Sequence, residues 1–430
     1  MTDTPRSTWR TALPVGTSPV AAGVVVNGLT SYAFLVLPAR LGVLDPGQYT
    51  AFTRLWFVLF VLAPGLFLPL EQEFARAVAA RRAAGEGTAP LVRRGLVWAA
   101  VGTAVGFGLA LVVALVGRER LFASQGQLVV ALVLAVPAYG LLHLGRGLLS
   151  GSGLFGGYGM TFGGEGLIRL LAVTPLLVLG VSRAGPYGLT TAVSPLLALA
   201  GALALHRPRL DPGPPVHRAE FGSSLPRLLG AQFLSQALVN SVPIAFALVA
   251  RDDPRAAALS AGVILTRVPL FMYQAVQASL IPRLAHLEST GALVEFRSTL
   301  GRLLVAMTAV VGLGVGLTLA VGPTIMGLAF GSEFVLDAGP LALLTAASGV
   351  FVLALASTQA LLTLRSPLPM IGAWAGGLAA GALVLTLGGD AVSRVTWGFL
   401  AATLTSWALA LTSLRPRLAR PSVVVDIPPE

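Results

Sequence analysis

The sequence lacks several residue types on which whole classes of chemistry depend. It contains no cysteine and no lysine, so all 29 basic residues are arginine. The missing cysteine excludes disulfides, thiolate metal sites and cysteine nucleophiles. The missing lysine excludes a Walker A phosphate loop and Schiff-base chemistry. Only four histidines are present, and none has the spacing of metal ligands. We therefore expect no metal, no cofactor and no enzymatic activity.

Charged residues are scarce as well. They make up 11% of the chain, against about 25% in a typical soluble domain. Hydrophobic residues make up 55%, and the mean hydropathy is +0.82. These values indicate an integral membrane protein. The net charge of +11 does not indicate nucleic-acid binding, because the arginines lie mainly in short loops between apolar runs.

Apolar runs of about 20 residues are long enough to cross a bilayer. The chain has twelve, at about 17–38, 48–70, 95–117, 127–148, 161–181, 186–205, 228–250, 257–281, 303–322, 339–362, 368–389 and 395–414. With the N-terminus inside, 19 arginines fall on the cytoplasmic side and seven outside. This bias predicts an all-α protein of about 12 transmembrane helices in the plasma membrane, with both termini cytoplasmic.

The sequence predicts a duplicated chain with a central linker. The proline-rich segment 206–224 follows the sixth span, which predicts an N-terminal six-helix lobe (1–205), a cytoplasmic linker (206–227) and a C-terminal six-helix lobe (228–430). When the sequence is compared with itself after a shift of 213 positions, Asn27 aligns with Asn240 and Thr53-Arg54 aligns with Thr266-Arg267. Both halves begin inside, so the two lobes are expected to be related by a pseudo-twofold along the membrane normal.

Arg54 and Arg267 lie inside spans, where a charge costs roughly 2.5–3.5 kcal/mol on insertion scales. Their matched positions predict two cations facing one another across a cavity that binds an anionic substrate. Polar side chains at helical spacing are predicted to line it: Asn27, Gln236, Asn240, Gln274 and Gln277. The alternatives stay open. The guanidinium groups would also be satisfied by snorkelling or by helix carbonyls and glutamines, and the polar stripes by contacts between helices.

Acidic residues near the spans are the candidates for gating or ion coupling. Glu71 and Glu73 end the second span, where they would form an inner gate or proton site, or merely mark a helix entering water. Glu165 and Arg169 form an i,i+4 pair that suits either ion coupling or a buried structural ion pair. The preceding stretch, 151–166, has eight glycines in sixteen residues and predicts close helix packing or hinge motion.

Four stretches resemble the bacterial polysaccharide-export flippases of the multidrug/oligosaccharidyl-lipid/polysaccharide exporter superfamily. They are "VLPARLGVLDPGQYTAFTRLWFVLF" (36–60), "HLGRGLLSGSGLFGGYGM" (143–160), "TRVPLFMYQAVQASLIPRLAHL" (266–287) and "IMGLAFGSEFVLDAGPLALL" (325–344). The resemblance implies a V-shaped pair of lobes that alternate between inward-open and outward-open states. It also implies that Arg54 and Arg267 are cavity arginines, with Arg40 as a weaker candidate.

The combined interpretation is a secondary flippase that needs no ATP. Its expected cargo is a polyprenyl-diphosphate-linked oligosaccharide, moved to the outer leaflet for cell-surface polysaccharide assembly. Its expected partners are this anionic lipid-linked substrate, membrane lipids and the polysaccharide polymerase machinery, and no nucleic acid. Two alternatives remain. One is an ion-coupled multidrug or metabolite antiporter of the same superfamily, and the other is a membrane scaffold without transport.

Overall fold

The computed structural model describes residues 17–217, 219–250, 253–364 and 366–418. Six helices form its first part: α1 (Thr17–Arg40), α2 (Pro46–Ala83), α3 (Ala89–Phe122), α4 (Gly126–Gly151), α5 (Phe155–Val178) and α6 (Ala184–Leu205). The second part contains α7 (Leu225–Val239), α8 (Ser241–Val249), α9 (Ala256–Leu265), α10 (Val268–Ser289), α11 (Leu293–Phe330), α12 (Ala338–Thr363), α13 (Pro367–Leu385) and α14 (Ala391–Leu418). A single 3-10 turn, η2 (Ser332–Phe334), follows α11.

The prediction of an all-α membrane protein is confirmed. Within the described ranges, ten helices are long and apolar enough to cross a membrane, or eleven if the bent pair α7–α8 counts as one span. Large apolar side chains are exposed on the outer faces of these helices, for example Leu115 on α3, Val178 on α5 and Leu313 on α11. Such surfaces suit contact with lipid rather than with water.

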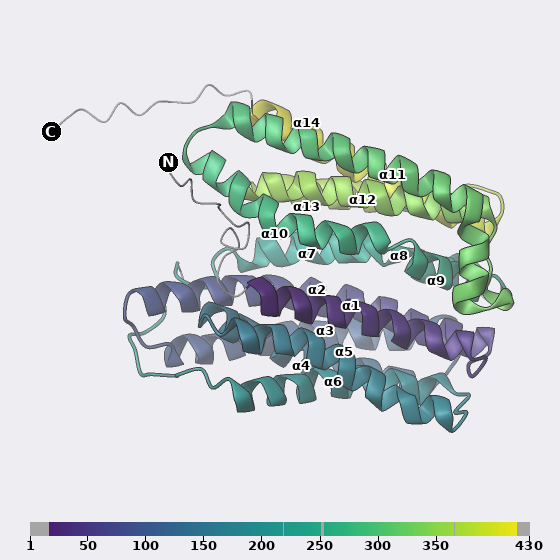
Figure 1. Ribbon diagram of the computed structural model, residues 1–430, viewed down its shortest axis with the longest axis horizontal. Coiled ribbons are helices and arrows are strands. Elements are labelled where there is room, and N and C mark those ends of the chain that lie inside the picture. Colours follow the sequence, from purple (N-terminus) through teal and green to yellow (C-terminus); the bar gives the residue numbers. More distant parts are fainter. Residues whose placement is uncertain (1–16, 218, 251–252, 365, 419–430) are drawn as a thin grey trace, which may run out of the picture.

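The helices gather into two bundles, α1–α6 and α7–α14, which lie one above the other in Figure 1. Helix α2 is the central element. It packs on α3 and α4 in its own bundle and on α7, α8 and α9 across the interface. It begins sharply, because Asp45 caps the backbone N–H of Gln48 at 2.9 Å and Pro46 occupies the first turn. Its aromatic residues Phe52, Phe57 and Phe67 are fully buried.

Two predicted spans are broken rather than continuous, which corrects the sequence interpretation. The span predicted at 228–250 divides at Asn240 into α7 and α8, with a bend of 61°. The span predicted at 257–281 divides at Thr266 and Arg267 into α9 and α10.

Proline explains both breaks, because it has no N–H to bond the carbonyl four residues earlier. Pro243 therefore leaves the carbonyl of Val239 without its helical partner, and Pro269 does the same to Leu265. After the shift of 213 positions, Thr30 and Trp56 are the residues of the first half that correspond to Pro243 and Pro269, and helices α1 and α2 are continuous there. The two halves therefore differ in helix continuity at the positions where only the second half has these prolines.

Helices α1 and α5 touch through glycine. A Cβ at Gly23 would lie 2.1 Å from the carbonyl oxygen of Gly159, and one at Gly159 would lie 2.3 Å from that of Pro19. A Cβ at Gly166 would lie 2.1 Å from the hydroxyl of Thr30. The glycine-rich stretch 151–166 therefore serves close packing of two backbones.

The segment between the bundles is fixed to the end of α2 by Arg81. This buried guanidinium donates to the backbone oxygen of Pro214 at 2.9 Å and to Glu220 Oε2 at 3.0 Å, and its Nε bonds Glu220 Oε1 at short range. The hydrogen bond with Arg81 holds the pKa of the Glu220 carboxyl below its usual range. The predicted division into two domains at 206–227 stays a prediction.

We expect Glu220→Gln to destabilise the protein by about 1–3 kcal/mol, since it removes the one carboxylate that is hydrogen-bonded to the buried Arg81 among the described residues. A lowered folded pKa stabilises the folded state above the unfolded pKa, and this stabilisation is lost as the pH falls through the folded pKa. The difference in thermal unfolding midpoint between wild type and variant should therefore be full at pH 7 and shrink below about pH 4.

Glu86→Gln is the matched control, because Glu86 is exposed and lies 3.9 Å from Arg81. Equal midpoints for Glu220→Gln and Glu86→Gln at pH 7 would contradict the role given to Glu220.

Candidate functional site

Two cavities lie between the bundles, and Arg267 borders the first of them, here called the arginine cavity. Its wall is formed by α1, α2, α5 and the break between α9 and α10, through residues that include Asn27, Ser31, Tyr32, Trp56, Phe162 and Arg267. Its cavity volume is about 190 Å³. Asn27, which was predicted to line a cavity, therefore does so together with Arg267 and with Ser31, one helical turn further along α1.

Arg267 is held by the broken end of α7. Its Nη2 donates to the carbonyl oxygen of Val239 at 3.1 Å and to Oδ1 of Asn240 at 2.7 Å. Its guanidinium carbon lies 4.8 Å from the centre of the Phe57 ring on α2. The Val239 carbonyl is the one that Pro243 leaves without a helical partner, so Arg267 satisfies a group that would otherwise be buried and unpaired.

The Nε donor of the Arg267 guanidinium is not used by a protein acceptor among the described residues. Among the described residues, no acceptor lies within hydrogen-bonding distance of its buried Nε, and no carboxylate forms an ion pair with it. A cation on a cavity wall without a carboxylate partner is suited to receive an anionic group.

Arg54 lies elsewhere. It is buried within the first bundle, and its Nη1 donates to the carbonyl oxygen of Arg120 at the end of α3, at 2.7 Å. The predicted arrangement of Arg54 and Arg267 across one shared cavity is therefore not what the structure has. Equivalent positions in the repeat received different partners, because only the second half has a broken helix for the arginine to bind. A binding role for Arg54 stays a prediction.

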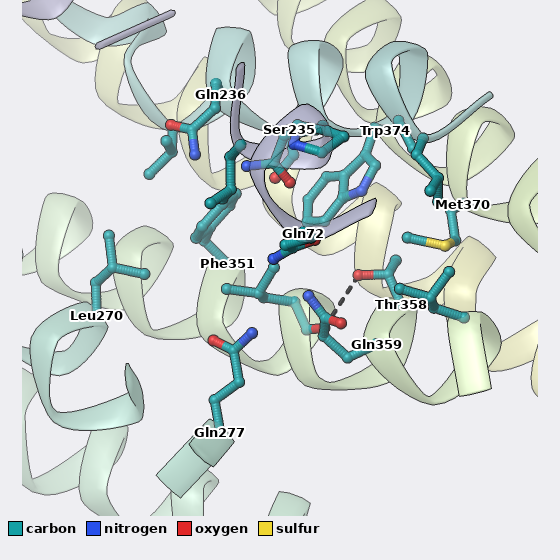
Figure 2. A pocket seen from close by; sticks show the side chains of 18 residues that line it. Gln72, Ser235, Gln236, Leu270, Gln277, Phe351, Thr358, Gln359, Met370 and Trp374 are labelled. Atoms are coloured by element: carbon teal, nitrogen blue, oxygen red, sulfur yellow. Dashed lines mark hydrogen bonds between the residues drawn. The ribbon is translucent and has the colours of Figure 1, made fainter. Parts of the chain in front are cut away.

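The second cavity, the glutamine cavity, lies beside the first and has a volume of about 180 Å³. Four helices bring amide side chains to its wall: Gln72 from α2, Gln232 and Gln236 from α7, Gln277 from α10 and Gln359 from α12 (Figure 2). The predicted residues Gln236 and Gln277 are thus brought together. The side chain of Gln274 lies outside the described part of the structure.

The two cavities are neighbours along α2. Phe60 lines the arginine cavity and Leu68 the glutamine cavity, and eight helical residues rise about 12 Å. Val239 lines the glutamine cavity and accepts a hydrogen bond from Arg267, which lines the other. The contact between Arg267 and the end of α7 therefore lies at the boundary between them.

The first bundle contains a buried charge network around Glu165. This carboxylate accepts from Tyr139 at 2.7 Å and from Arg146 at 2.8 Å, and it also forms a short contact with Arg169. Arg169 in turn donates to Ser31 Oγ on the wall of the arginine cavity, at 3.1 Å. The predicted pair of Glu165 and Arg169 is therefore real, but a second arginine joins it.

Glu71 is also buried in this bundle, within the long helix α2. His143 Nδ1 lies 2.7 Å from its Oε2, and the Tyr158 hydroxyl donates to its Oε1 at 2.8 Å. Sequence reasoning did not find His143 or Tyr158, because 72 and 87 residues separate them from Glu71. The apolar neighbours of His143 in its own helix were the available signal, since a histidine there needs a polar partner.

The remaining predicted site residues lie away from both cavities. Glu73 forms an ion pair with the exposed Arg76 at 2.9 Å and accepts from Ser224 at 3.2 Å, so it joins α2 to the start of α7. Arg40 is exposed at the end of α1. In the described part of the chain, no group of three or more histidine, aspartate or glutamate residues is arranged to hold a metal ion.

Comparisons with known proteins place this geometry in a known fold. No protein-family model matches the chain. Uncharacterized proteins of Mycobacterium bovis and Mycobacterium tuberculosis are each 28% identical to it over 446 residues, which covers 94% of this chain and 96% of theirs.

Among solved structures, the chain resembles a multidrug resistance MATE family transporter of the MOP superfamily in its inward-facing conformation, with a TM-score of 0.67, 12% identity and 95% of each chain covered. A eukaryotic MATE transporter gives a TM-score of 0.65 at 13% identity, with 93% of each chain covered. A MOP superfamily transporter from Pyrococcus furiosus, described as having a binding pocket of reverse polarity, gives 0.64 at 12% identity, with 94% of this chain and 95% of that one covered.

These likenesses show that the chain has the MATE transporter fold. They confirm the expected two-lobed, all-helical architecture of the superfamily. The expected membership of the polysaccharide-export branch stays a prediction.

We expect Glu165→Gln to destabilise the protein by about 3–5 kcal/mol, because it leaves Arg146 and Arg169 buried without a carboxylate. Glu295→Gln, at an exposed position in the first turn of α11, is the control and should change little. Thermal unfolding of the purified protein measures both. A Glu165→Gln variant as stable as wild type would show that Glu165 is not a structural ion pair and would favour a coupling role.

Proposed function

We propose that this protein is a secondary transporter that works by alternating access of its two bundles, as an ion-coupled antiporter. The proposal rests on one observation above all: two adjoining polar cavities lie between bundles that have the fold of MATE transporters. In transporters built from repeats, rocking of one unit against the other exposes such a site to each side in turn.

The contacts between the bundles support this mechanism. Near the start of α2, the buried Tyr49 packs on Phe334 and Phe330 of the other bundle, with ring centres 5.0 and 6.5 Å apart. With the predicted orientation, this end faces outward, so the bundles are closed on that side. Gln72 lines the glutamine cavity and is exposed, which indicates that this cavity is open toward the opposite side.

The charges that line the cavities favour an anionic or uncharged cargo over a cationic drug. Arg267 is the cation of the arginine cavity, and no aspartate or glutamate is among the residues described as lining either cavity. A cationic cargo would face Arg267 without a carboxylate to stabilise it.

The coupling ion in this proposal is a proton held by the Glu71–His143 pair. Arg146 and Arg169 both pair with Glu165, whereas His143 lies against Glu71. Tyr139 lies between the two pairs, because its hydroxyl donates to Glu165 and its ring centre is 6.4 Å from that of His143. The hydrogen bonds from Glu165 through Arg169 to Ser31 reach the wall of the arginine cavity. In this proposal they couple the proton to the cargo.

A second candidate function is the flippase for a polyprenyl-diphosphate-linked oligosaccharide. The observation that favours it is Arg267, a buried cation with free bonding capacity, because a diphosphate is a strong acceptor for a guanidinium. The multidrug transporters among the solved structures support the antiporter at least as well. A plasma-membrane location with cytoplasmic termini and an interaction with polysaccharide polymerase machinery belong to this second proposal.

Native mass spectrometry of the gently purified protein tests the cargo. We expect wild type to retain an anionic species that is lost from Arg267→Gln and kept by Arg302→Gln, whose arginine is exposed on α11. Prenyl, diphosphate and hexose masses would identify the flippase, and a small metabolite would identify the antiporter.

Arg267→Lys separates charge from structure in this experiment, since it keeps the cation but not the planar fork that binds the end of α7. The thermal unfolding midpoint of each variant shows whether it is folded. Identical retained species in folded wild type and folded Arg267→Gln would remove Arg267 from the proposed site.

A further inference from the structure

The glutamine cavity has a composition that a structural role does not explain. The chain contains nine glutamines, and five of them line this cavity although they come from four helices. No arginine, histidine, aspartate or glutamate is among the residues described as lining it. The other polar side-chain groups on its wall are the hydroxyls of Ser235 and Thr358 and the indole N–H of Trp374.

Most of the glutamine amides on this wall are available to hydrogen-bond a ligand, because they do not bond one another. Gln236 is engaged, since its Oε1 lies 3.3 Å from the Asn240 Nδ2 donor. Within the described residues, the amides of Gln72, Gln277 and Gln359 make no hydrogen bond, and Figure 2 shows them pointing into the same space from three helices. Behind them, Trp374 and Phe351 form an apolar wall, with ring centres 5.3 Å apart.

This composition selects against two classes of ligand. A charged group would enter a site with no opposite charge to replace its hydration, which is costly at membrane depth. A purely apolar group would leave several amides facing it without partners, at about 1–3 kcal/mol for each lost hydrogen-bonding group. Each glutamine presents two N–H donors and one carbonyl acceptor. The ligand that satisfies such a wall is uncharged and both donates and accepts hydrogen bonds at several points.

We propose that the glutamine cavity binds an uncharged, hydroxyl-rich group, the chemistry of a sugar ring, with Gln72, Gln277 and Gln359 as its main partners. This inference rests on the proposed transport function, whose substrate class it names. Because the Arg267 contact borders this cavity, one cargo that has an anionic part and a hydroxyl-rich part fits both cavities at once. The chain then recognises the two parts by different means.

The experiment measures binding of octyl β-D-glucoside, below its micelle-forming concentration, to protein purified in a detergent that contains no sugar. Octyl sulfate and octyltrimethylammonium have the same tail with an anionic or cationic head, so they control for binding of the tail alone. The variants are the double substitution Gln72→Met and Gln359→Met, which keeps side-chain length, and the control Gln127→Met at an exposed position outside the cavity.

We expect octyl glucoside to bind wild type and Gln127→Met equally and to bind the double variant at least about fivefold more weakly, because two hydrogen-bonding side chains are lost. The two charged amphiphiles should not distinguish the double variant from wild type. Equal affinity of glucoside for wild type and for a folded double variant would overturn the inference, as would tighter binding of the cationic amphiphile than of the glucoside.

The outcome is separable from that of the proposed transport function. If glucoside binding is unaffected in the double variant while an anionic species still depends on Arg267, only the inference about the glutamine cavity fails. If glucoside binding depends on Gln72 and Gln359 but reconstituted protein moves no retained species across a vesicle membrane, the site stands and the transport proposal fails.

Discussion

The hydrogen bonds from Arg267 to the end of α7 are the interaction on which the centre of this structure depends. Inside a membrane, a carbonyl without a partner costs several kcal/mol, since there is no water to replace the lost bond. Pro243 creates such a carbonyl at Val239, and the Arg267 guanidinium bonds it and the neighbouring Asn240. The benefit is mutual, because the C-terminal end of a helix carries partial negative charge and stabilises the cation.

This arrangement also explains how a guanidinium is tolerated without a carboxylate. In the first bundle, Arg146 and Arg169 share the Glu165 carboxylate as their ion-pair partner. In the second, Arg267 is stabilised by backbone and amide dipoles and keeps its net charge. The two bundles therefore stabilise their buried arginines in different ways. One contains buried ion pairs, and the other presents a cation next to a wall of neutral amides.

Composition and hydropathy were sufficient to predict the architecture, and the internal repeat was sufficient to single out Arg267 and Asn240. The partners of these residues were not predictable in the same way. Pro243 and Pro269 were visible signals for the helix breaks, but the hydropathy of both spans is uninterrupted and concealed them. Arg54 shows the opposite failure, since a matched position in the repeat suggested a shared cavity whereas local packing gave it the end of α3.

The parts of the site that sequence reasoning missed share a physical cause. His143 meets Glu71, and Gln359 joins Gln72, only because α2 packs on α4 in one bundle and lies beside the other bundle. Periodicity within one helix reports which face is polar, but it does not report which distant helix that face will meet. A polar residue in the middle of an apolar helix therefore indicated that the residue has a polar partner, but it did not indicate which one.

The glycine contact between α1 and α5 has a mechanical consequence. With backbone against backbone at Gly23 and Gly159, these helices have no side-chain layer between them that would allow sliding. Helix α1 provides a wall of the arginine cavity, and α5 carries Glu165 and Arg169. The two helices should therefore move as one rigid unit, which keeps Arg169 beside Ser31 on the cavity wall.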